Sequence, residues 1–169
     1  KGMINRPIRA MIVGVPNVGK STYINGIARR ASAKTGNKPG VTKGKQWIKI
    51  DKDIELLDTP GILWPKFEDQ SVGLKLAIIG SIKDELLQNY HLAINLITFM
   101  QEFYLNNLGK RYDIDPSKTS DKVLEDIATR RGCIVKGGQL DLDKAANIFL
   151  DDFRNGKLGR ITLELPEKK

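Results

Sequence analysis

One eight-residue string restricts the fold of this chain more than any other feature of its sequence. The string is Gly14-Val15-Pro16-Asn17-Val18-Gly19-Lys20-Ser21, and it fits the pattern G-x-x-x-x-G-K-[ST] at every position. An apolar run over residues 8–13 precedes it and predicts a buried strand, and residues 20–30 predict a helix. A strand, a glycine-containing turn and a helix in this order are typical of a loop whose backbone N–H groups surround a phosphate. The string therefore predicts an α/β fold with a phosphate site at the end of its first strand.

The residue types in this loop suit a nucleoside triphosphate. Lys20 is expected to reach the β- and γ-phosphates, and the hydroxyl of Ser21 is expected to bind Mg²⁺. Glycines let the backbone wrap around the phosphates, and the helix adds the positive end of its dipole. The candidate nucleotide-binding residues here are Pro16, Asn17, Val18, Gly19, Lys20, Ser21 and Thr22. The alternative interpretation is an ordinary glycine turn with a capping serine.

Two further motifs follow the loop in the order that phosphoryl-transfer proteins use. Pro39-Gly40-Val41-Thr42 lies in a loop, from which Thr42 can reach a Mg²⁺ ion when a γ-phosphate is present. Asp58-Thr59-Pro60-Gly61 follows an apolar run and begins 38 positions after Lys20. Asp58 is placed to hold the metal through water, and the N–H of Gly61 is placed to bind the γ-phosphate. Each motif alone is common in turns, so their combination and order carry the prediction.

The α/β part is expected to cover residues 1–82. Within it, residues 46–50 and 54–57 predict two short strands joined by a tight turn. Residues 72–79 predict a helix near the end of this part. The first domain would therefore hold the phosphate loop and both of the motifs that follow it.

The rest of the chain, residues 83–169, has a purely helical pattern. Apolar residues recur with the spacing of one helix face over 92–103, 123–128 and 142–153. Ser120 is the expected N-cap of the second of these helices, and Asn155-Gly156 is the expected stop of the third. The stripes predict a helical C-terminal domain with a common apolar core.

Positive charge is concentrated in the first third of the chain. The 169 residues carry a net charge of +8, and residues 1–50 hold eleven Lys or Arg and no Asp or Glu. Residues 67–169 hold fifteen basic and sixteen acidic residues, so the excess charge belongs to the N-terminal part. This distribution favours a polyanionic partner there, either a nucleotide or an RNA. No run of 18 apolar residues occurs, so the sequence predicts no membrane-spanning helix.

The rarest residue types exclude two kinds of site. Cys133 is the single cysteine, which excludes an internal disulfide framework, and we interpret it as a small buried apolar residue. His91 is the single histidine, which excludes a multi-histidine metal site. We interpret His91 as a solvated or capping residue rather than a catalytic one.

Longer strings around these motifs resemble one known family. The combination PNVGKS, PGVT and DTPG is similar to the translation-factor class of P-loop GTPases. The strings IRAMIVGVPNVGKST, AKTGNKPGVTKGKQWIKI and ELLDTPGILWPKFED, with RRGC, KGG and KLGRITLE further on, resemble ribosome biogenesis GTPase A, the YlqF or RbgA family. The resemblance covers nearly the whole chain. It implies GTP and GDP as ligands, Mg²⁺ as cofactor, and the large ribosomal subunit with its rRNA as partner in late assembly.

The same resemblance implies several finer properties. Asn17 stands at the position that binds K⁺ in related K⁺-stimulated GTPases, although asparagine also suits an ordinary turn. The implied protein is a monomer of the bacterial cytoplasm, without a membrane partner, and the mitochondrial matrix is the alternative location.

A motif that reads guanine, N-K-x-D, is absent from the region after the P-loop. In the resembled family the G domain is circularly permuted, so that the guanine-reading motifs precede the P-loop, and the first residue here, Lys1, is not a methionine. The expected fold class is therefore an incomplete, circularly permuted α/β P-loop GTPase part followed by an all-helical C-terminal domain. These 169 residues alone are expected to bind nucleotide weakly and to hydrolyse GTP weakly or not at all.

Ile62 occupies a position that bears on hydrolysis. Many small GTPases have a glutamine after the glycine of the second motif, and that glutamine orients the attacking water. An isoleucine side chain cannot hydrogen-bond water, so intrinsic hydrolysis is expected to be slow and stimulated by the large subunit. No residue of this chain is assigned as a certain catalytic group.

The candidate RNA-contact residues are all basic and form two groups. They are Arg29, Arg30, Lys43 and Lys45 near the first helix and loop, and Arg130, Arg131, Lys136 and Lys144 around a glycine turn in the helical part. Such a turn before a helix can bind an RNA phosphate, but a solvated surface is the alternative. For the whole protein the alternatives are an RNA-binding module that uses nucleotide only as an occupancy signal, and an ATPase with an unrelated P-loop.

Overall fold

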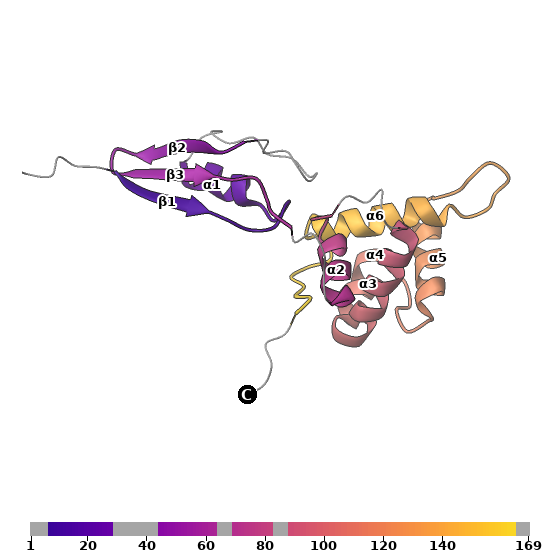
Figure 1. Ribbon diagram of the computed structural model, residues 1–169. Helices are drawn as coiled ribbons and strands as arrows, with labels where there is room; N and C mark the ends of the chain where they lie inside the picture. The colour runs from indigo at the N-terminus through magenta and orange to yellow at the C-terminus, as the bar shows by residue number, and fades with distance from the viewer. Residues whose placement is uncertain (1–6, 29–43, 64–68, 83–87, 165–169) are drawn as a thin grey trace, which may run out of the picture. The chain divides into compact units, whose positions relative to one another are not determined.

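Two units make up the chain, and the nucleotide-loop motif lies in the first. The computed structural model describes residues 7–28, 44–63, 69–82 and 88–164. The first unit consists of Lys1–Gln70 with Gly80–Lys83, and the second of Ser71–Ile79 with Asp84–Lys169. The first unit contains the strands β1 (Ile8–Ile12), β2 (Gln46–Asp51) and β3 (Ile54–Asp58) and the helix α1 (Lys20–Ala28), all visible in Figure 1.

The three strands form one mixed sheet in the order β1-β3-β2. β1 runs parallel to β3, and β2 runs antiparallel to β3. Ile12 pairs with Asp58, so the carboxyl ends of the two parallel strands are adjacent. The loops that leave β1 and β3 therefore start at the same edge of the sheet. The strand, loop and helix order expected around the eight-residue string is confirmed.

The expectation that the first strand is buried is wrong for the described residues. Ile8 is 69% exposed and Met11 is 60% exposed, because α1 packs against β2 and β3 and leaves β1 at the open edge of the sheet. The small core of this unit consists of Ile24, Ile48 and Leu56, with Ile12 and Ile50 packed against it.

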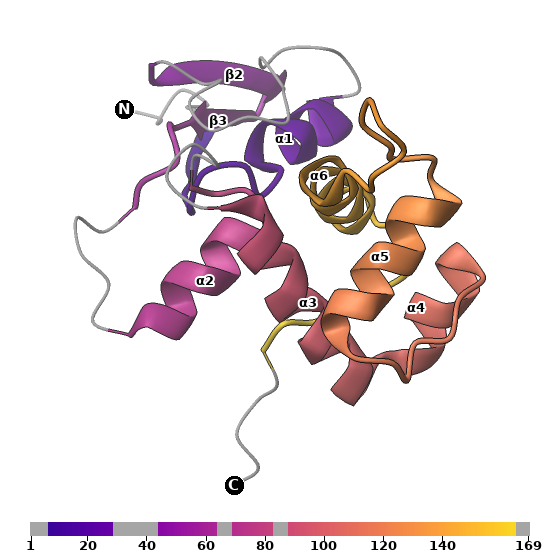
Figure 2. The same cartoon turned by 90° about the vertical axis from the view of Figure 1, so that its right-hand side faces the viewer.

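Among the described residues, five helices belong to the second unit. They are α2 (Gln70–Ile78), α3 (Asn89–Phe103), α4 (Leu105–Tyr112), α5 (Ser120–Arg130) and α6 (Leu142–Arg154), and α2 begins one residue before the unit does. α3 packs against α4, α5 and α6, and Figure 2 shows these helices side by side. None of the described helices is both long and apolar enough to cross a lipid bilayer.

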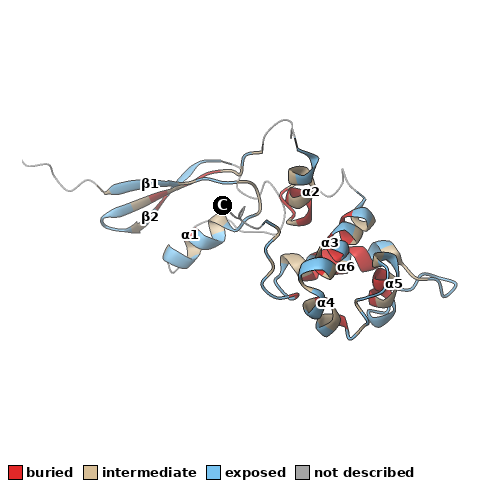
Figure 3. Ribbon diagram, turned by 90° about the horizontal axis from the view of Figure 1, so that it is seen from below, coloured by how far each residue is buried: buried red, intermediate tan, exposed pale blue. Residues whose placement is uncertain are grey.

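The three apolar stripes expected in the helical part are confirmed. Leu96 of α3, Ile127 of α5 and Phe149 of α6 are fully buried in one core, and Figure 3 shows the buried residues on the faces that these helices turn toward one another. Cys133 is buried in the same core, as expected, and His91 is exposed. α4 was not anticipated, and the N-cap of α5 is Thr119 rather than Ser120.

The last division between the two units falls after Lys83, one residue from the boundary expected after residue 82, but residues 71–79 depart from that expectation. Residues 71–79 belong with the helical unit, because Ala77 and Ile78 of α2 are buried in its core. Arg154 at the end of α6 donates hydrogen bonds of 2.9 Å to the backbone carbonyls of both Ala77 and Ile78. These carbonyls end a helix and have no partners within it, so Arg154 caps α2 from another helix.

A buried carboxylate ties three segments of the helical unit together. Asp152 of α6 is 3% exposed, and its Oδ2 accepts hydrogen bonds from Arg111 of α4 and Arg131 after α5, each at 2.8 Å. The hydroxyl of Tyr112 donates to the same oxygen at 3.2 Å, and Lys157 donates to Oδ1 at 3.0 Å. Burial alone raises the pKa of Asp152, but the hydrogen bonds from Lys157 and Arg111 outweigh it and hold that pKa below its ordinary value.

Candidate functional site

The candidate site lies where the carboxyl ends of β1 and β3 meet. The loop of residues 14–19 continues from β1 into α1, and residues 58–61 continue from β3. Thr59 Oγ1 donates a hydrogen bond of 2.7 Å to the carbonyl of Ile12, which ties the two strand ends together. In parallel α/β sheets, ligands bind beyond this edge, so the fold brings both motifs to the expected place.

Lys20 lies over the loop that precedes it. Its Nζ donates to the carbonyls of Gly14 at 3.1 Å and Val15 at 2.7 Å. Partial burial lowers the pKa of Lys20, and the negative charge of Asp58 partly offsets that effect. An ammonium group held at the mouth of such a loop is suited to bind phosphate oxygens, which would favour its charged form.

Ser21 and Asp58 form the pair expected at a Mg²⁺ site. Ser21 Oγ donates a hydrogen bond of 3.1 Å to Asp58 Oδ2, while Asp58 Oδ1 is buried and has no hydrogen-bond partner among the residues that the structure describes. A buried carboxylate oxygen without a donor costs free energy, and a cation or its water ligand would satisfy it. The donor set, one hydroxyl and one carboxylate, consists of the oxygen ligands that Mg²⁺ prefers, so the residues present fit this ion.

Asn17 adopts an uncommon backbone conformation in the loop, with φ of +59°. Asparagine tolerates this left-handed region better than most residues. Its Nδ2 donates to the carbonyl of Gly80 at 3.2 Å. The K⁺ role expected for Asn17 stays a prediction.

Gly61 is pressed against the loop. A β-carbon at Gly61 would lie 2.4 Å from both the Cα and the N of Pro16, a distance that requires the backbone to shift. The N–H of the next residue, Ile62, donates to the carbonyl of Gly14 at 3.3 Å, and the Ile62 side chain is 75% exposed. The glycine of the second motif is therefore required by this close approach of two backbones.

Replacing Gly61 with alanine is expected to displace Pro16 and weaken nucleotide binding by about tenfold or more, because the clash is with backbone atoms that cannot rotate away. Titration with a fluorescent guanine nucleotide measures the effect. Gly26→Ala is the matched control, because no atom of the described part of the chain lies within 4 Å of a β-carbon built at that position. Equal affinities in the two variants would contradict the close-approach argument.

Of the remaining candidate nucleotide-binding residues, three lie in the described part of the chain and one does not. Val18 and Gly19 lie in the loop, and Thr22 lies in the first turn of α1. Thr42 lies outside the described residues, so its expected role at the metal stays a prediction.

The basic residues expected to contact RNA fall into separate groups. Arg29, Arg30 and Lys43 lie outside the described residues, and Lys45 is exposed next to β2. Lys144 is exposed in the first turn of α6, and Lys136 is exposed in the loop between α5 and α6, which extends away from the helices in Figure 1.

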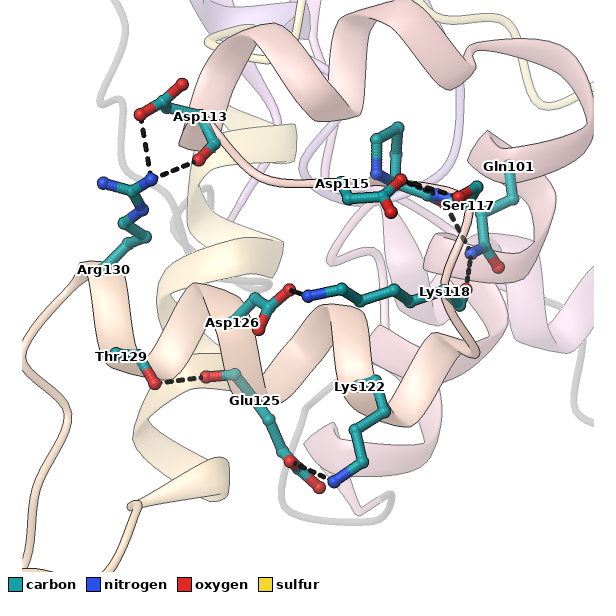
Figure 4. Close-up of polar contacts among 11 residues, drawn as sticks. Gln101, Asp113, Asp115, Ser117, Lys118, Lys122, Glu125, Asp126, Thr129 and Arg130 are labelled. Atoms are coloured by element: carbon teal, nitrogen blue, oxygen red, sulfur yellow. Dashed lines mark hydrogen bonds and ion pairs between the residues drawn. The ribbon is translucent and has the colours of Figure 1, made fainter.

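The two adjacent arginines form internal ion pairs. Arg130 pairs with Asp113 at 2.9 Å, next to the pair of Lys118 and Asp126 (Figure 4). These residues line an open hollow of about 310 Å³. Arg131 belongs to the cluster around Asp152. Arg131 therefore has a structural role, whereas the pair of Arg130 and Asp113 is exposed, and such pairs contribute little to stability.

Two residues beside the loop were not anticipated from the sequence. Gly80 and Ser81 follow α2 in the chain, and Ser81 Oγ donates a hydrogen bond of 2.6 Å to the carbonyl of Pro16. No local pattern marks these residues, because they are brought to the loop only by the tertiary structure.

The strand, loop and helix with Lys20, Ser21 and Asp58 define a P-loop nucleotide-binding domain, here with a helical unit attached. The chain belongs to the family described as 50S ribosome-binding GTPase, whose model matches residues 9–131.

The predicted resemblance to ribosome biogenesis GTPase A is confirmed by individual relatives. The protein of that name from Bacillus cereus is 51% identical over 169 residues, covering 99% of this chain and 57% of the relative. The one from Thermotoga maritima is 34% identical over 163 residues, covering 96% of this chain and 58% of the relative. The chain therefore spans somewhat more than half the length of these proteins.

Two solved structures have the same fold. A structure described as GDP-bound TM YlqF matches 98% of this chain and 63% of its own, with a TM-score of 0.64 and 30% identity. A structure of GNP-bound YlqF from T. maritima matches 95% of this chain and 60% of its own, with a TM-score of 0.62 and 31% identity. The expected α/β P-loop GTPase part followed by a helical part is thereby confirmed, and the structure adds that its sheet is small and mixed.

Proposed function

We propose that the protein binds GTP and GDP with Mg²⁺ and hydrolyses GTP. The observation that carries this proposal is the Ser21–Asp58 pair next to Lys20, with one buried carboxylate oxygen that no described residue hydrogen-bonds. Family membership supports the choice of guanine nucleotide over ATP. The two YlqF structures, one described as GDP-bound and the other as GNP-bound, support the same ligand class.

In this proposal the chain's own residues position the phosphate groups of the nucleotide and neutralise their negative charge. Backbone N–H groups of the loop bind the phosphates, and Lys20 adds a charge-assisted contact to them. Ser21 and Asp58 would hold Mg²⁺, joined by Thr42, and Gly61 would donate its N–H to the γ-phosphate. When bound, the ion neutralises charge on the β- and γ-phosphate oxygens.

Ile62 cannot orient the attacking water, so another group must do so. The Ile62 side chain carries no hydrogen-bonding atom, so the attacking water is not held from this position. We propose that hydrolysis by the protein alone is slow and that docking on the large ribosomal subunit stimulates it. The K⁺ proposed at Asn17 would add a second cation beside the phosphates.

The proposed partner is the large ribosomal subunit and its rRNA, during late assembly. The relatives' name, ribosome biogenesis GTPase A, and the family description support a ribosomal partner. The excess of basic residues in positions 1–50 supports contact with a polyanion. Lys45, Arg130, Lys136 and Lys144 are candidates with exposed side chains among the described residues. We propose a monomer that acts in the bacterial cytoplasm.

The test is GTP turnover by the complete protein, titrated with purified large subunits at several KCl concentrations. We expect the rate to rise with subunit concentration, and the binding affinity to fall with salt by a log–log slope of roughly −0.7 to −0.9 for each neutralised phosphate. An unchanged rate at saturating subunits rejects stimulated hydrolysis. Binding that is insensitive to salt rejects the phosphate contacts.

The second candidate function is an RNA-binding module in which nucleotide serves only as an occupancy signal. The observation that favours it is Ile62, whose exposed side chain cannot orient water. The same titration decides between the two functions. Nucleotide-dependent docking without turnover, with or without subunits, would select the second one.

A further inference from the structure

The loop of residues 14–19 is hydrogen-bonded to residues 80–81, which belong to none of the sequence motifs. Ser81 is fully buried, and its hydroxyl donates to the carbonyl of Pro16 at 2.6 Å. In return, the side-chain amide of Asn17 donates to the carbonyl of Gly80 at 3.2 Å. Two consecutive residues of the loop are therefore bonded to two consecutive residues of the segment that follows α2.

The bond from Ser81 fixes the orientation of one peptide group in the loop. In a trans peptide the C=O and N–H bonds point in opposite directions. Holding the carbonyl of Pro16 toward Ser81 therefore directs the N–H of Asn17 to the opposite side. A loop that binds phosphate through its N–H groups needs its carbonyls turned outward, since a carbonyl oxygen repels a phosphate oxygen.

The hydrogen bonds of Lys20 go to other carbonyls of the loop than the one that Ser81 holds. The ammonium group of Lys20 bonds to the carbonyls of Gly14 and Val15, the two residues before Pro16. When Lys20 turns to a bound phosphate, these bonds are given up. The bond from Ser81 uses the carbonyl oxygen of Pro16, which is not one of the groups proposed to bind phosphate, so it can persist when Lys20 turns to the nucleotide.

The neighbouring residue of the segment contributes through its backbone. Gly80 is buried and has a φ of +76°, a left-handed conformation in which a side chain is strained. In this conformation the carbonyl of Gly80 accepts the hydrogen bond from the side chain of Asn17. Asn17 itself has a φ of +59°. The contact stabilises Asn17 in a backbone region that non-glycine residues seldom adopt.

We propose that Gly80 and Ser81 are positioning residues for nucleotide binding, which act by preorganising the peptide group between Pro16 and Asn17. Because residues 80–81 already hold this peptide group in place, nucleotide binding does not have to provide the free energy that orders it. This inference rests on the proposed nucleotide binding, and it adds two residues outside the consensus loop. Their effect is expected in affinity for the phosphate chain and in the rate of nucleotide release.

Ser81→Ala in the complete protein provides the test. The variant leaves the partly buried carbonyl of Pro16 without the donor at Ser81, and we expect GDP to bind about 5- to 10-fold more weakly, with a correspondingly faster release. Affinity is measured by fluorescent-GDP titration, release by chase with unlabelled GDP, and folding by thermal unfolding without nucleotide. Ser120→Ala is the matched control, because Ser120 makes a comparable hydroxyl bond of 2.9 Å to Gln101 in the helical unit.

The outcomes separate a positioning role from a purely structural one. Weaker GDP binding by Ser81→Ala, with wild-type GDP binding by Ser120→Ala and a nucleotide-free unfolding midpoint close to that of the wild type, supports the proposal. Wild-type GDP affinity in Ser81→Ala overturns it, as does a loss of affinity matched by a loss of nucleotide-free stability. Gly80→Ala is a second variant with the same expected loss of affinity. If the wild type itself does not bind GDP, the proposed function fails instead.

Discussion

Replacing Lys20 with alanine will lower the affinity for GTP and GDP by about 100-fold, enough to abolish binding at micromolar nucleotide. Lys20 carries the positive charge of the loop, and its Nζ lies within 3.1 Å of the loop carbonyls. A hydrogen bond to a charged group contributes about 1.5–3 kcal/mol, and phosphate is a doubly charged partner in a partly dehydrated site. The loss follows directly from removing that bond. Titration with a fluorescent nucleotide in the complete protein measures it.

Lys52→Ala is the matched control for this prediction. Lys52 is exposed in the turn between β2 and β3, so the control removes the same charge from the same unit without changing the loop. Its affinity should stay within about twofold of the wild type, because exposed charges are largely screened. Wild-type affinity in Lys20→Ala would reject the site assignment. Equal losses in both variants would show a general electrostatic effect instead of a specific contact.

Replacing Asp152 with asparagine will destabilise the helical unit by about 2–3 kcal/mol. Removing one partner of a buried ion pair commonly costs about 3–5 kcal/mol, and the partial exposure of the partners reduces that cost. The side chains of Arg111 and Arg131 are 30% and 33% exposed, so water replaces part of the lost interaction. For a unit of this size the change corresponds to a drop of about 10–20 °C in the unfolding midpoint. Circular dichroism at the helix band measures it.

The pH dependence of the same variant gives an independent check. The pKa of Asp152 is lowered in the folded state, so its contribution to stability is complete above the ordinary aspartate value and is lost as the pH falls through the folded pKa. The stability difference between wild type and Asp152→Asn should stay constant from pH 7 to about 5 and narrow below about 4. The control is Asp151→Ala, an exposed acid on the same helix, which should shift the midpoint little. A difference that grows toward low pH would contradict the account.

The chain's own sequence determined the local parts of the site. The pattern from Gly14 to Ser21 specified a strand, a loop and a helix, because each residue type there has a backbone preference that acts over a few neighbours. The helical stripes in α3, α5 and α6 were equally local, since one turn of a helix relates residues three or four apart. Asp58 could be assigned because its motif follows an apolar run. The strings that resemble a known family supplied the proposed ligand and the proposed class of partner.

Tertiary structure alone decided which separate segments meet. Gly61 is required by the approach of Pro16, a residue 45 positions earlier, and Ser81 bonds to Pro16 from 65 positions later. Asp152 gathers cations from three segments that carry no shared pattern. α2 belongs to the helical unit because Ala77 and Ile78 are buried in its core, although the sequence pattern predicted this helix as part of the domain that holds the sheet. Such contacts depend on packing between distant parts of the chain, and local preferences and periodicity hold no information about which distant parts will pack.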